Sequence, residues 1–371
     1  MSELSPSELL THVDEVLVDV WTDEVRDESL AHNRLAPKVM EQIRELGWAG
    51  LAAPEDVGGI GLNPSELLPV FQRLGQRLVA GPLFEYLVVP GLLLEVANRH
   101  PVPDAIREVL VALTTLDARI AVVDPAASQS ADLSIGSVQA SPARLDGQVD
   151  IVRGAADATH LIVHAEQDGQ PVVAVVPSSR AGVSIEERPS TDPGMDICRV
   201  RLQDVTITDD DVAWSGPVAA QVWADILAWA RAFTAAELTG MARHLHDLSV
   251  DYTSTRKQFG RPVGSFQAIQ HLAADNARRV VMIEALCEAT AQDADDAQDS
   301  SRRVAAATFK ALASEFSREV AQSALQMHGG IGFTQEYQLH WYFKRVLSLH
   351  SWYGNHHELA REIGRSRLAA A

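Results

Sequence analysis

One apolar stripe limits the fold of this chain more than any other feature of its sequence. Apolar side chains recur every three or four residues over about seven helical turns, at Ile226, Trp229, Phe233, Met241, Leu245, Leu248 and Tyr252. A second stripe runs from Phe309 to Ala324. Long helices joined by short connections favour an antiparallel arrangement, so we expect residues 216–371 to form a C-terminal four-helix bundle.

The remaining sequence divides into two further parts. Residues 1–115 repeat apolar residues at helical spacing, which predicts an N-terminal helical domain. Residues 116–215 instead hold short runs rich in Val and Ile between clusters of Gly, Asp, Ser and Pro. This pattern predicts a middle domain that is a β-barrel or a sheet. The expected fold class is therefore α+β, in the order helical domain, β domain, helical bundle.

Composition excludes several functions. The net charge of −19 argues against a nucleic-acid partner, because phosphate contacts need clustered Lys and Arg. Cys198 and Cys287 fit no zinc spacing, and the adjacent His356 and His357 would point apart on a helix, so no metal is expected. No apolar run is long enough to span a membrane, and the acidic N-terminus is unlike a signal peptide. We expect a cytoplasmic protein that does not contact a membrane.

Two motifs in the last third of the chain favour a phosphate-containing cofactor. Arg256 offers a planar fork of donors suited to a pyrophosphate, and Gly260 and Pro262 are expected to end the long helix with Arg256 in its last turn. Gly329 and Gly330 remove side chains, so that a backbone can approach a ligand closely. In the alternative interpretation, Arg256 only neutralises a helix C-terminus and the two glycines only stop a helix.

Taken with the domain order, three segments resemble the acyl-CoA dehydrogenase family over nearly the whole chain. Residues 46–62 are similar to its N-terminal turn. Residues 256–267 are similar to its Arg-x-x-Phe-Gly segment, which has a Gln eleven residues after the Arg. Residues 326–332 are similar to its Gln-x-x-Gly-Gly-x-Gly stretch. The resemblance implies FAD as cofactor, an acyl-CoA thioester as substrate and an electron-transfer flavoprotein or similar electron acceptor.

The family uses these last two segments across a subunit boundary. They contact the adenosine-diphosphate part of an FAD whose flavin ring is held by the neighbouring subunit. The resemblance therefore implies a set of cofactor-binding residues at Arg256, Gln267, Gln326, Met327, His328, Gly329 and Gly330.

The sequence departs from the family where a subunit holds its own flavin ring. Residues 122–130 match the family's Val-Thr-Glu-Pro-x-x-Gly-Ser-Asp only in part, with Val123 in place of the Thr at the flavin edge. Arg153 stands in place of the Thr of the family's Trp-Ile-Thr. These differences indicate a lost flavin pocket, or else a divergent pocket that works through other contacts.

The carboxylate that serves as the family's base is also missing. The resemblance places that base at Tyr353, or in a minority of members at Ala230, one residue before a substrate-binding Arg that is retained as Arg231. A tyrosine, with an ordinary pKa of about 10, is a poor base at neutral pH. Glu358 and Glu362 follow shortly after and are best interpreted as solvated helix carboxylates. Arg231 could face substrate or could serve as a buried ion-pair partner.

The losses fall on one side of a subunit boundary. Contacts that a subunit gives to its neighbour's FAD are kept, whereas those for its own flavin ring and for proton abstraction are lost. We therefore expect the non-catalytic subunit of a heteromeric acyl-CoA dehydrogenase. The expected assembly is an α2β2 tetramer with one FAD per heterodimer, in which a paralogous chain supplies the flavin pocket and the Glu base.

Such a pairing resembles the enzymes of bacterial steroid side-chain degradation, which act on bulky acyl-CoA esters. Two alternatives stay open. One is an active homotetrameric dehydrogenase with a relocated base. The other is a scaffold on the same fold without a redox role.

Overall fold

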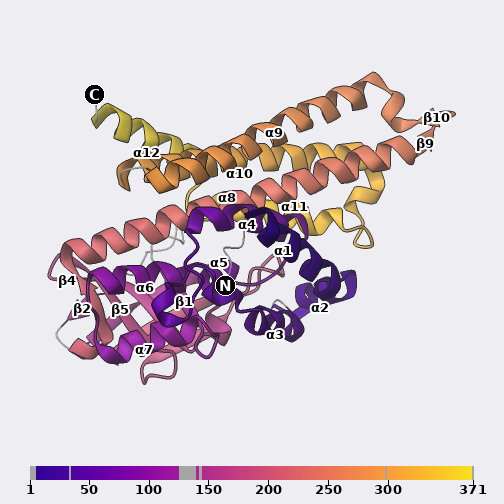
Figure 1. Cartoon of the computed structure of the whole chain (residues 1–371). Coiled ribbons are helices and arrows are strands. Elements are labelled where there is room, and N and C mark those ends of the chain that lie inside the picture. The colour runs from indigo at the N-terminus through magenta and orange to yellow at the C-terminus, as the bar shows by residue number, and fades with distance from the viewer. Residues whose placement is uncertain (1–5, 33–34, 125–138, 142–143, 297–298, 370–371) are drawn as a thin grey trace. The chain divides into compact units, whose positions relative to one another are not determined.

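The computed structural model describes residues 6–32, 35–124, 139–141, 144–296 and 299–369 (Figure 1). The chain divides into two compact units. One unit consists of Met1–Asp19, Ser65–Val79 and Arg231–Ala371, and the other of Val20–Pro64 and Ala80–Ala230. The three-part division suggested by the sequence stays a prediction.

The first unit is helical. Its longest helices are α8 (Gly216–Thr255), which belongs to this unit from Arg231 onward, α9 (Gln267–Asp296) and α10 (Asp299–His328). The shorter helical elements of the unit are α1 (Pro6–Val20), η3 (Pro64–Leu67), α4 (Leu68–Gln76), η6 (Val263–Ser265), η7 (Gly329–Phe333), α11 (Leu339–Ser351) and α12 (His356–Ala369). Figure 1 shows α9 and α10 running alongside each other, as expected for a bundle.

Phe233, Met241 and Leu245 of the apolar stripe on α8 lie in the core of this unit. Phe233 and Leu245 are fully buried, and the Phe233 ring lies 4.4 Å from that of Phe71 on α4. Two glycines allow the helices to cross this closely. A Cβ at Gly240 would come within 1.9 Å of the Gln72 carbonyl oxygen, and one at Gly75 within 2.2 Å of the Glu237 carbonyl oxygen. Burial of the stripe is the main stabilising contribution here.

The second unit combines a sheet with short helices. The helical elements are α2 (Asp23–His32), α3 (Pro37–Glu45), η1 (Trp48–Gly50), η2 (Glu55–Val57), α5 (Leu83–Leu87), α6 (Val89–Arg99), α7 (Asp104–Leu113), η4 (Ala155–Asp157) and η5 (Asp209–Asp211). The strands are β1 (Ile120–Val123), β2 (Gln139–Ser141), β3 (Arg144–Arg153), β4 (His160–Gln167), β5 (Gln170–Pro177), β6 (Val183–Glu187), β7 (Ile197–Thr206) and β8 (Val212–Ser215).

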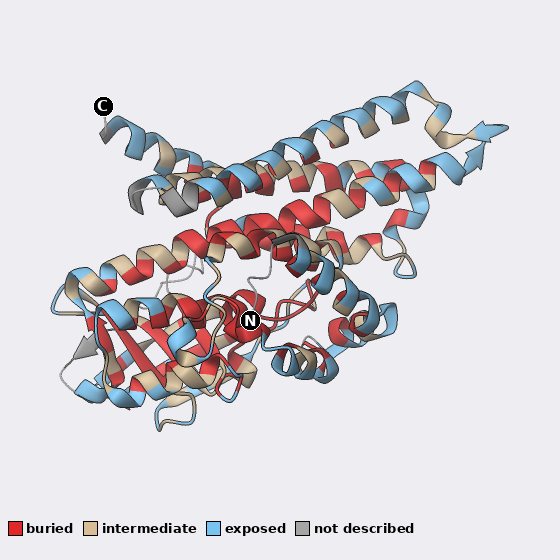
Figure 2. Cartoon of the chain, viewed as in Figure 1, coloured by how far each residue is buried: buried red, intermediate tan, exposed pale blue. Residues whose placement is uncertain are grey.

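These strands form one mixed sheet in the order β6-β7-β3-β2-β4-β5-β8, with β1 paired in parallel to β4. Alternate residues of β7 are buried, so one face of that strand packs on the core. Leu145, Val163 and Val200 are among the apolar residues of this core, which Figure 2 shows as a buried interior of the strand region. The predicted α+β fold is confirmed.

The end of α8 differs from the sequence-based expectation. The helix stops at Thr255, and Arg256 follows it instead of lying within its last turn. The cause is a small hairpin, β9 (Lys257–Gln258) and β10 (Arg261–Pro262). Its two connecting residues, Phe259 and Gly260, have φ of 54° and 81°, as a tight two-residue hairpin turn requires.

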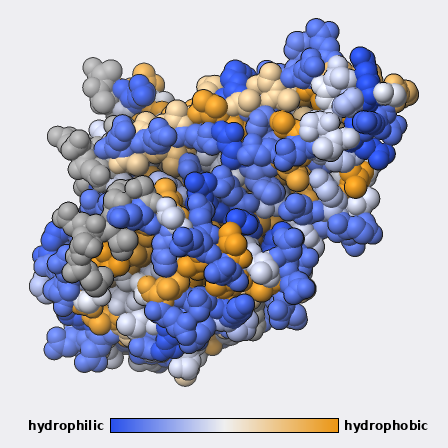
Figure 3. All heavy atoms as spheres, turned by 45° about the vertical axis from the view of Figure 1, so that its right-hand side comes forward, coloured by the Kyte–Doolittle hydropathy of each residue, from blue (hydrophilic) through white to orange (hydrophobic). Residues whose placement is uncertain are grey.

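The residues that the structure describes include no helix long and apolar enough to cross a membrane. Hydrophilic residues cover most of the face shown in Figure 3, in line with the net charge of −19.

Candidate functional site

The two predicted cofactor motifs meet at one end of the helical unit. The ring of His328, the last residue of α10, stacks on Tyr252 of α8 with centroids 4.5 Å apart and planes 21° apart. The Tyr252 carbonyl accepts a hydrogen bond of 2.9 Å from the backbone N–H of Arg256. The stacked pair therefore brings Arg256 and the Gln326–Gly330 segment together, although they are far apart in sequence.

His328 is fixed by two hydrogen bonds. It is 4% exposed, and its Nδ1 lies 2.8 Å from the Ala324 carbonyl oxygen. A carbonyl can only accept, so Nδ1 carries the proton and Nε2 accepts from the Tyr337 hydroxyl at 3.1 Å. Burial lowers the pKa of His328, which keeps the ring neutral.

Met327 also points into the protein. It is 3% exposed, and its sulfur lies 3.9 Å from the Asn276 side-chain nitrogen on α9. Among the predicted cofactor residues, the side chains of Met327 and His328 thus anchor the segment from inside. Any contact they make with a ligand would come from their backbone atoms.

The other predicted cofactor residues are exposed: Arg256, Gln267, Gln326, Gly329 and Gly330. Within the part of the chain that the structure describes, the Arg256 guanidinium makes no hydrogen bond or ion pair. A Cβ added at Gly330 would meet nothing within 4 Å, and the backbone there does not have a positive φ. The fold of the chain itself does not require glycine at 330, whereas a closely approaching ligand would.

The hairpin beside Arg256 presents an apolar tip. Phe259 is 92% exposed, and Arg261 lies over the Phe266 ring, 4.0 Å from its centroid. The sequence analysis missed this feature, although Phe259–Gly260 between short extended residues is a hairpin signal.

In the second unit, the residues expected at a flavin ring are engaged by the protein. Val123 is fully buried in β1. Arg153 is 5% exposed, and its guanidinium donates a hydrogen bond to the Gly81 carbonyl. A buried charge is costly to release from its acceptors. Residues 125–130, which the sequence comparison also covered, lie outside the described residues.

Tyr353, where the sequence resemblance places the family's usual base, lies in a tight turn between α11 and α12. Tyr353 has φ of 58° and Gly354 has φ of 111°. The Arg231 guanidinium donates through Nε to the Tyr353 carbonyl at 3.0 Å. Its other two nitrogens bind the Glu362 carboxylate at 2.7 and 2.8 Å. In this structure Arg231 is an ion-pair partner of Glu362, which is one of the two roles that the sequence allows.

Glu358 is engaged as well. Its Oε2 accepts from the Asn355 backbone N–H at 3.0 Å, while Asn355 Oδ1 accepts from the N–H groups of His357 and Glu358 at 3.0 and 3.1 Å. This reciprocal arrangement caps the N-terminus of α12. The other suggested base position, Ala230, is buried and carries no carboxylate.

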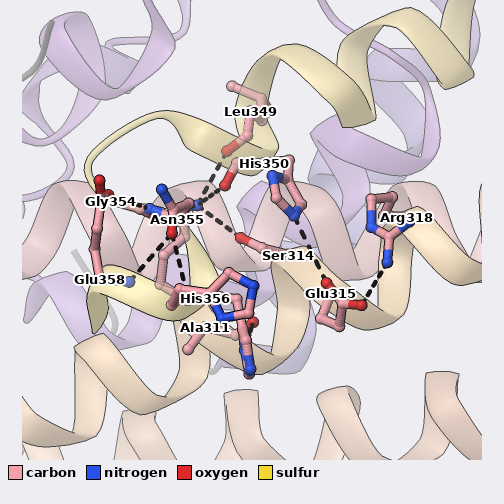
Figure 4. A network of polar contacts seen from close by, with 12 residues as sticks. Ala311, Ser314, Glu315, Arg318, Leu349, His350, Gly354, Asn355, His356 and Glu358 are labelled. Carbon is pink, nitrogen blue, oxygen red and sulfur yellow. Dashed lines mark hydrogen bonds and ion pairs between the residues drawn. The ribbon is translucent and has the colours of Figure 1, made fainter. Parts of the chain in front are cut away.

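A hollow of about 510 Å³ adjoins this cap, lined by Glu315, Arg318, His350, Ser351, Asn355, His356 and His357. Figure 4 shows the polar contacts of Glu315, Arg318 and His350. The hydrogen bond from Arg318 lowers the pKa of Glu315. Burial and the charge of Lys310 lower the pKa of His350. Among the described residues, no group of three or more His, Cys, Asp or Glu could hold a metal ion.

Comparison with known proteins identifies the family. The sequence model of the acyl-CoA dehydrogenase C-terminal domain matches residues 220–368. Acyl-CoA dehydrogenase IpdE2 of Mycobacterium tuberculosis is 32% identical over 304 residues, covering 81% of this chain and 77% of the relative. This chain belongs to the acyl-CoA dehydrogenase family. It spans 40% of the length of another curated relative, acyl-CoA dehydrogenase FadE34 of the same organism, at 28% identity over 320 residues.

Two solved structures are similar over the whole fold. A chain of the ChsE4-ChsE5 complex from M. tuberculosis has a TM-score of 0.87 at 24% identity, covering 100% of this chain and 98% of that one. A chain of the Tcur3481-Tcur3483 steroid acyl-CoA dehydrogenase has a TM-score of 0.84 at 25% identity, covering 99% and 100%. These likenesses confirm the fold predicted from the sequence.

Proposed function

We propose that this chain is the non-catalytic subunit of a heteromeric FAD-dependent acyl-CoA dehydrogenase. A paralogous chain supplies the flavin pocket and the Glu base. This chain completes FAD binding with Arg256, Gln267 and the Gln326–Gly330 segment. The observation that carries the proposal is the exposed Arg256 side chain, which has no partner among the described residues and is linked through Tyr252 and His328 to the segment with the open Gly330.

The chemistry of these residues fits the adenosine-diphosphate part of FAD. A guanidinium binds a pyrophosphate through parallel charge-assisted hydrogen bonds. Gly330 leaves room for the ligand beside the backbone, and the exposed amides of Gln267 and Gln326 can donate and accept. When bound, FAD supplies the electron acceptor for oxidation of the acyl chain. The residues of this chain bind and orient the nucleotide end only.

The base region supports a non-catalytic role. Abstraction of the proton beside a thioester carbonyl needs a carboxylate within hydrogen-bond reach. The two nearby candidates are occupied, because Glu358 caps α12 and Glu362 binds Arg231. A relocated base would have to give up one of these contacts, so the alternative of an active homotetramer is less favoured.

Similarity to chains of two-component enzymes supports a heteromer, which we place in an α2β2 tetramer with one FAD per heterodimer. One of these similar proteins is a steroid acyl-CoA dehydrogenase, which supports a bulky steroid side-chain CoA ester as substrate. Electrons would pass to an electron-transfer flavoprotein or a similar acceptor. We place the complex in the cytoplasm.

The test compares the chain purified alone with the chain co-expressed with a paralogous acyl-CoA dehydrogenase encoded beside it. We expect no visible flavin absorbance from the lone chain and one FAD per heterodimer in the complex. Arg256→Ala should lower the FAD retained by the complex at least tenfold, since one charge-assisted contact contributes about 1.5–3 kcal/mol. Arg99→Ala, which removes an exposed arginine of the other unit, is the matched control.

The same measurement separates the alternatives. Stoichiometric FAD with dehydrogenase activity in the lone chain would overturn the proposal in favour of a relocated base. A complex that forms without any flavin would instead support the scaffold.

A further inference from the structure

Lys310 lies within α10, and its side chain is fully buried, with 0% exposure. Of the 31 lysines and arginines in the chain only four are lysines: Lys38, Lys257, Lys310 and Lys344. Burying an ammonium costs on the order of several kcal/mol unless its protons are well bound. Apolar packing alone does not offset this cost, so polar contacts must stabilise the buried Lys310 ammonium.

Four neutral oxygen atoms surround the ammonium, and Figure 4 shows the residues that provide them. Nζ donates to Ser314 Oγ at 2.7 Å and to the carbonyls of Leu349, His350 and Gly354 at 3.0, 3.2 and 3.4 Å. Leu349 and His350 lie in the last turn of α11, where carbonyls lack intrahelical partners and the helix dipole is negative. Lys310 thus caps the C-terminus of α11 from within the protein.

The same cation extends to the turn that follows α11. It holds the Gly354 carbonyl, while Arg231 of α8 holds the preceding Tyr353 carbonyl. Two cations from different helices therefore bind successive carbonyls of one turn. Tyr353 has a left-handed backbone, which costs a bulky residue about 1–2 kcal/mol. Such a conformation persists only where its surroundings hold it in place.

We propose that Lys310 is a positioning residue, which fixes the Trp352–Gly354 turn against α10 and thereby sets the conformation in which Tyr353 is presented. This inference does not depend on the proposed sharing of FAD. It applies to the folded chain with or without a partner.

The charged groups around Lys310 come from several helices. Arg231 lies on α8 and His350 on α11, while α12 contributes Glu358 and Glu362, which are bound to Asn355 and Arg231. Glu315, on α10 itself, binds Arg318. No carboxylate among the described residues binds Nζ. Burial and then the charge of Arg231 lower the pKa of Lys310 to about 7.

The lowered pKa fixes the sign of a pH effect. When the turn opens, Lys310 meets water and regains its ordinary pKa of about 10.4. Between about pH 7 and pH 10 the open state binds more protons than the closed one, so raising the pH favours the closed turn. Below about pH 7 the effect is flat. A neutral amine still donates two protons to the carbonyls, so the contacts survive deprotonation.

Two measurements on the full chain test the proposal. NMR of the protein labelled at the lysine side chains follows only four signals, and Lys310→Met identifies the one of interest. We expect that signal to titrate near pH 7. Hydrogen exchange of a peptide spanning 349–356, corrected for intrinsic rates, should slow by up to about tenfold per pH unit above pH 7. A peptide within 238–248 of α8 is the reference.

Lys310→Met should expose the turn to faster exchange and abolish its pH dependence, while the α8 peptide is unchanged. A wild-type turn with pH-independent protection, or a Met variant with the wild-type profile, would overturn the proposal. If Lys310→Met does not fold, the wild-type profile still decides. Ser314→Ala, which removes one acceptor, should then move the Lys310 midpoint to lower pH.

Discussion

At the residue scale, all three guanidinium nitrogens of Arg231 donate hydrogen bonds within the protein. Its side chain is 9% exposed, and it binds Glu362 and the Tyr353 carbonyl. Sequence alone could not choose between this role and contact with substrate, because Glu362 is distant in sequence and its approach depends on how α12 packs. Arg153 is similar: its replacement of a small residue is visible in the sequence, whereas its acceptor, the Gly81 carbonyl, is not.

Removing the charge of Glu362 should leave Arg231 without a counter-ion in a mostly buried place. We expect Glu362→Gln to lower the free energy of unfolding by about 1–2 kcal/mol, less than for a fully buried pair because the Glu362 side chain is 51% exposed. Chemical denaturation followed by circular dichroism measures the change.

The control is Glu95→Gln, which breaks the Arg99–Glu95 pair. Both of its side chains are more than half exposed, so the cost should stay below about 0.5 kcal/mol. If the two substitutions lower the free energy of unfolding equally, the Arg231–Glu362 pair contributes no more to stability than an exposed pair.

At the element scale, two glycines form a matched pair. Gly330 in η7 and Gly364 in α12 both have open space where a Cβ would lie, and neither has a positive φ. Gly364→Ala should raise the unfolding free energy by about 0.5–1 kcal/mol, because alanine favours a helix.

Gly330→Ala should leave the stability of the lone chain nearly unchanged but weaken FAD retention by the complex at least tenfold, since the added methyl group meets the ligand. Thermal unfolding and flavin released on gel filtration measure the two effects. Unchanged FAD retention in Gly330→Ala would contradict a close approach of the cofactor at this segment.

The helices and the strands could be predicted as elements because their apolar periodicities differ. The end of α8 was placed wrongly, since Gly260 and Pro262 were interpreted as a helix stop, whereas Gly260 lies in the turn of a hairpin and Pro262 in its second strand. The burial of Lys310 could not be predicted, because a single lysine in the sequence of a helix is usually exposed to solvent. Only the packing of α11 shows that carbonyl oxygens surround it.

At the scale of the whole molecule, the family fold could be predicted because its motifs and domain order are spread along the chain in sequence. The structure of one chain does not show that a site is shared between two chains. The proposal of a shared site rests on two observations: the Arg256 guanidinium has no partner among the described residues, and the fold of the chain does not require glycine at 330.

The proposal fixes a stoichiometry. Native mass spectrometry of the co-expressed complex should show two copies of this 40.3 kDa chain, two copies of its paralogue and two FAD molecules. Four copies of this chain with four FAD molecules would contradict the heteromer.

The hairpin tip has a consequence for how cells make this protein. Phe259 is 92% exposed and Phe333 is 73% exposed. In a chain without its partner, these two aromatic side chains are an exposed apolar surface that favours aggregation. Chains produced in excess of their partner should therefore tend to aggregate, or to be bound by chaperones and degraded by proteases. Balanced synthesis of the two polypeptides, such as translation from one message, would avoid an unmatched surplus.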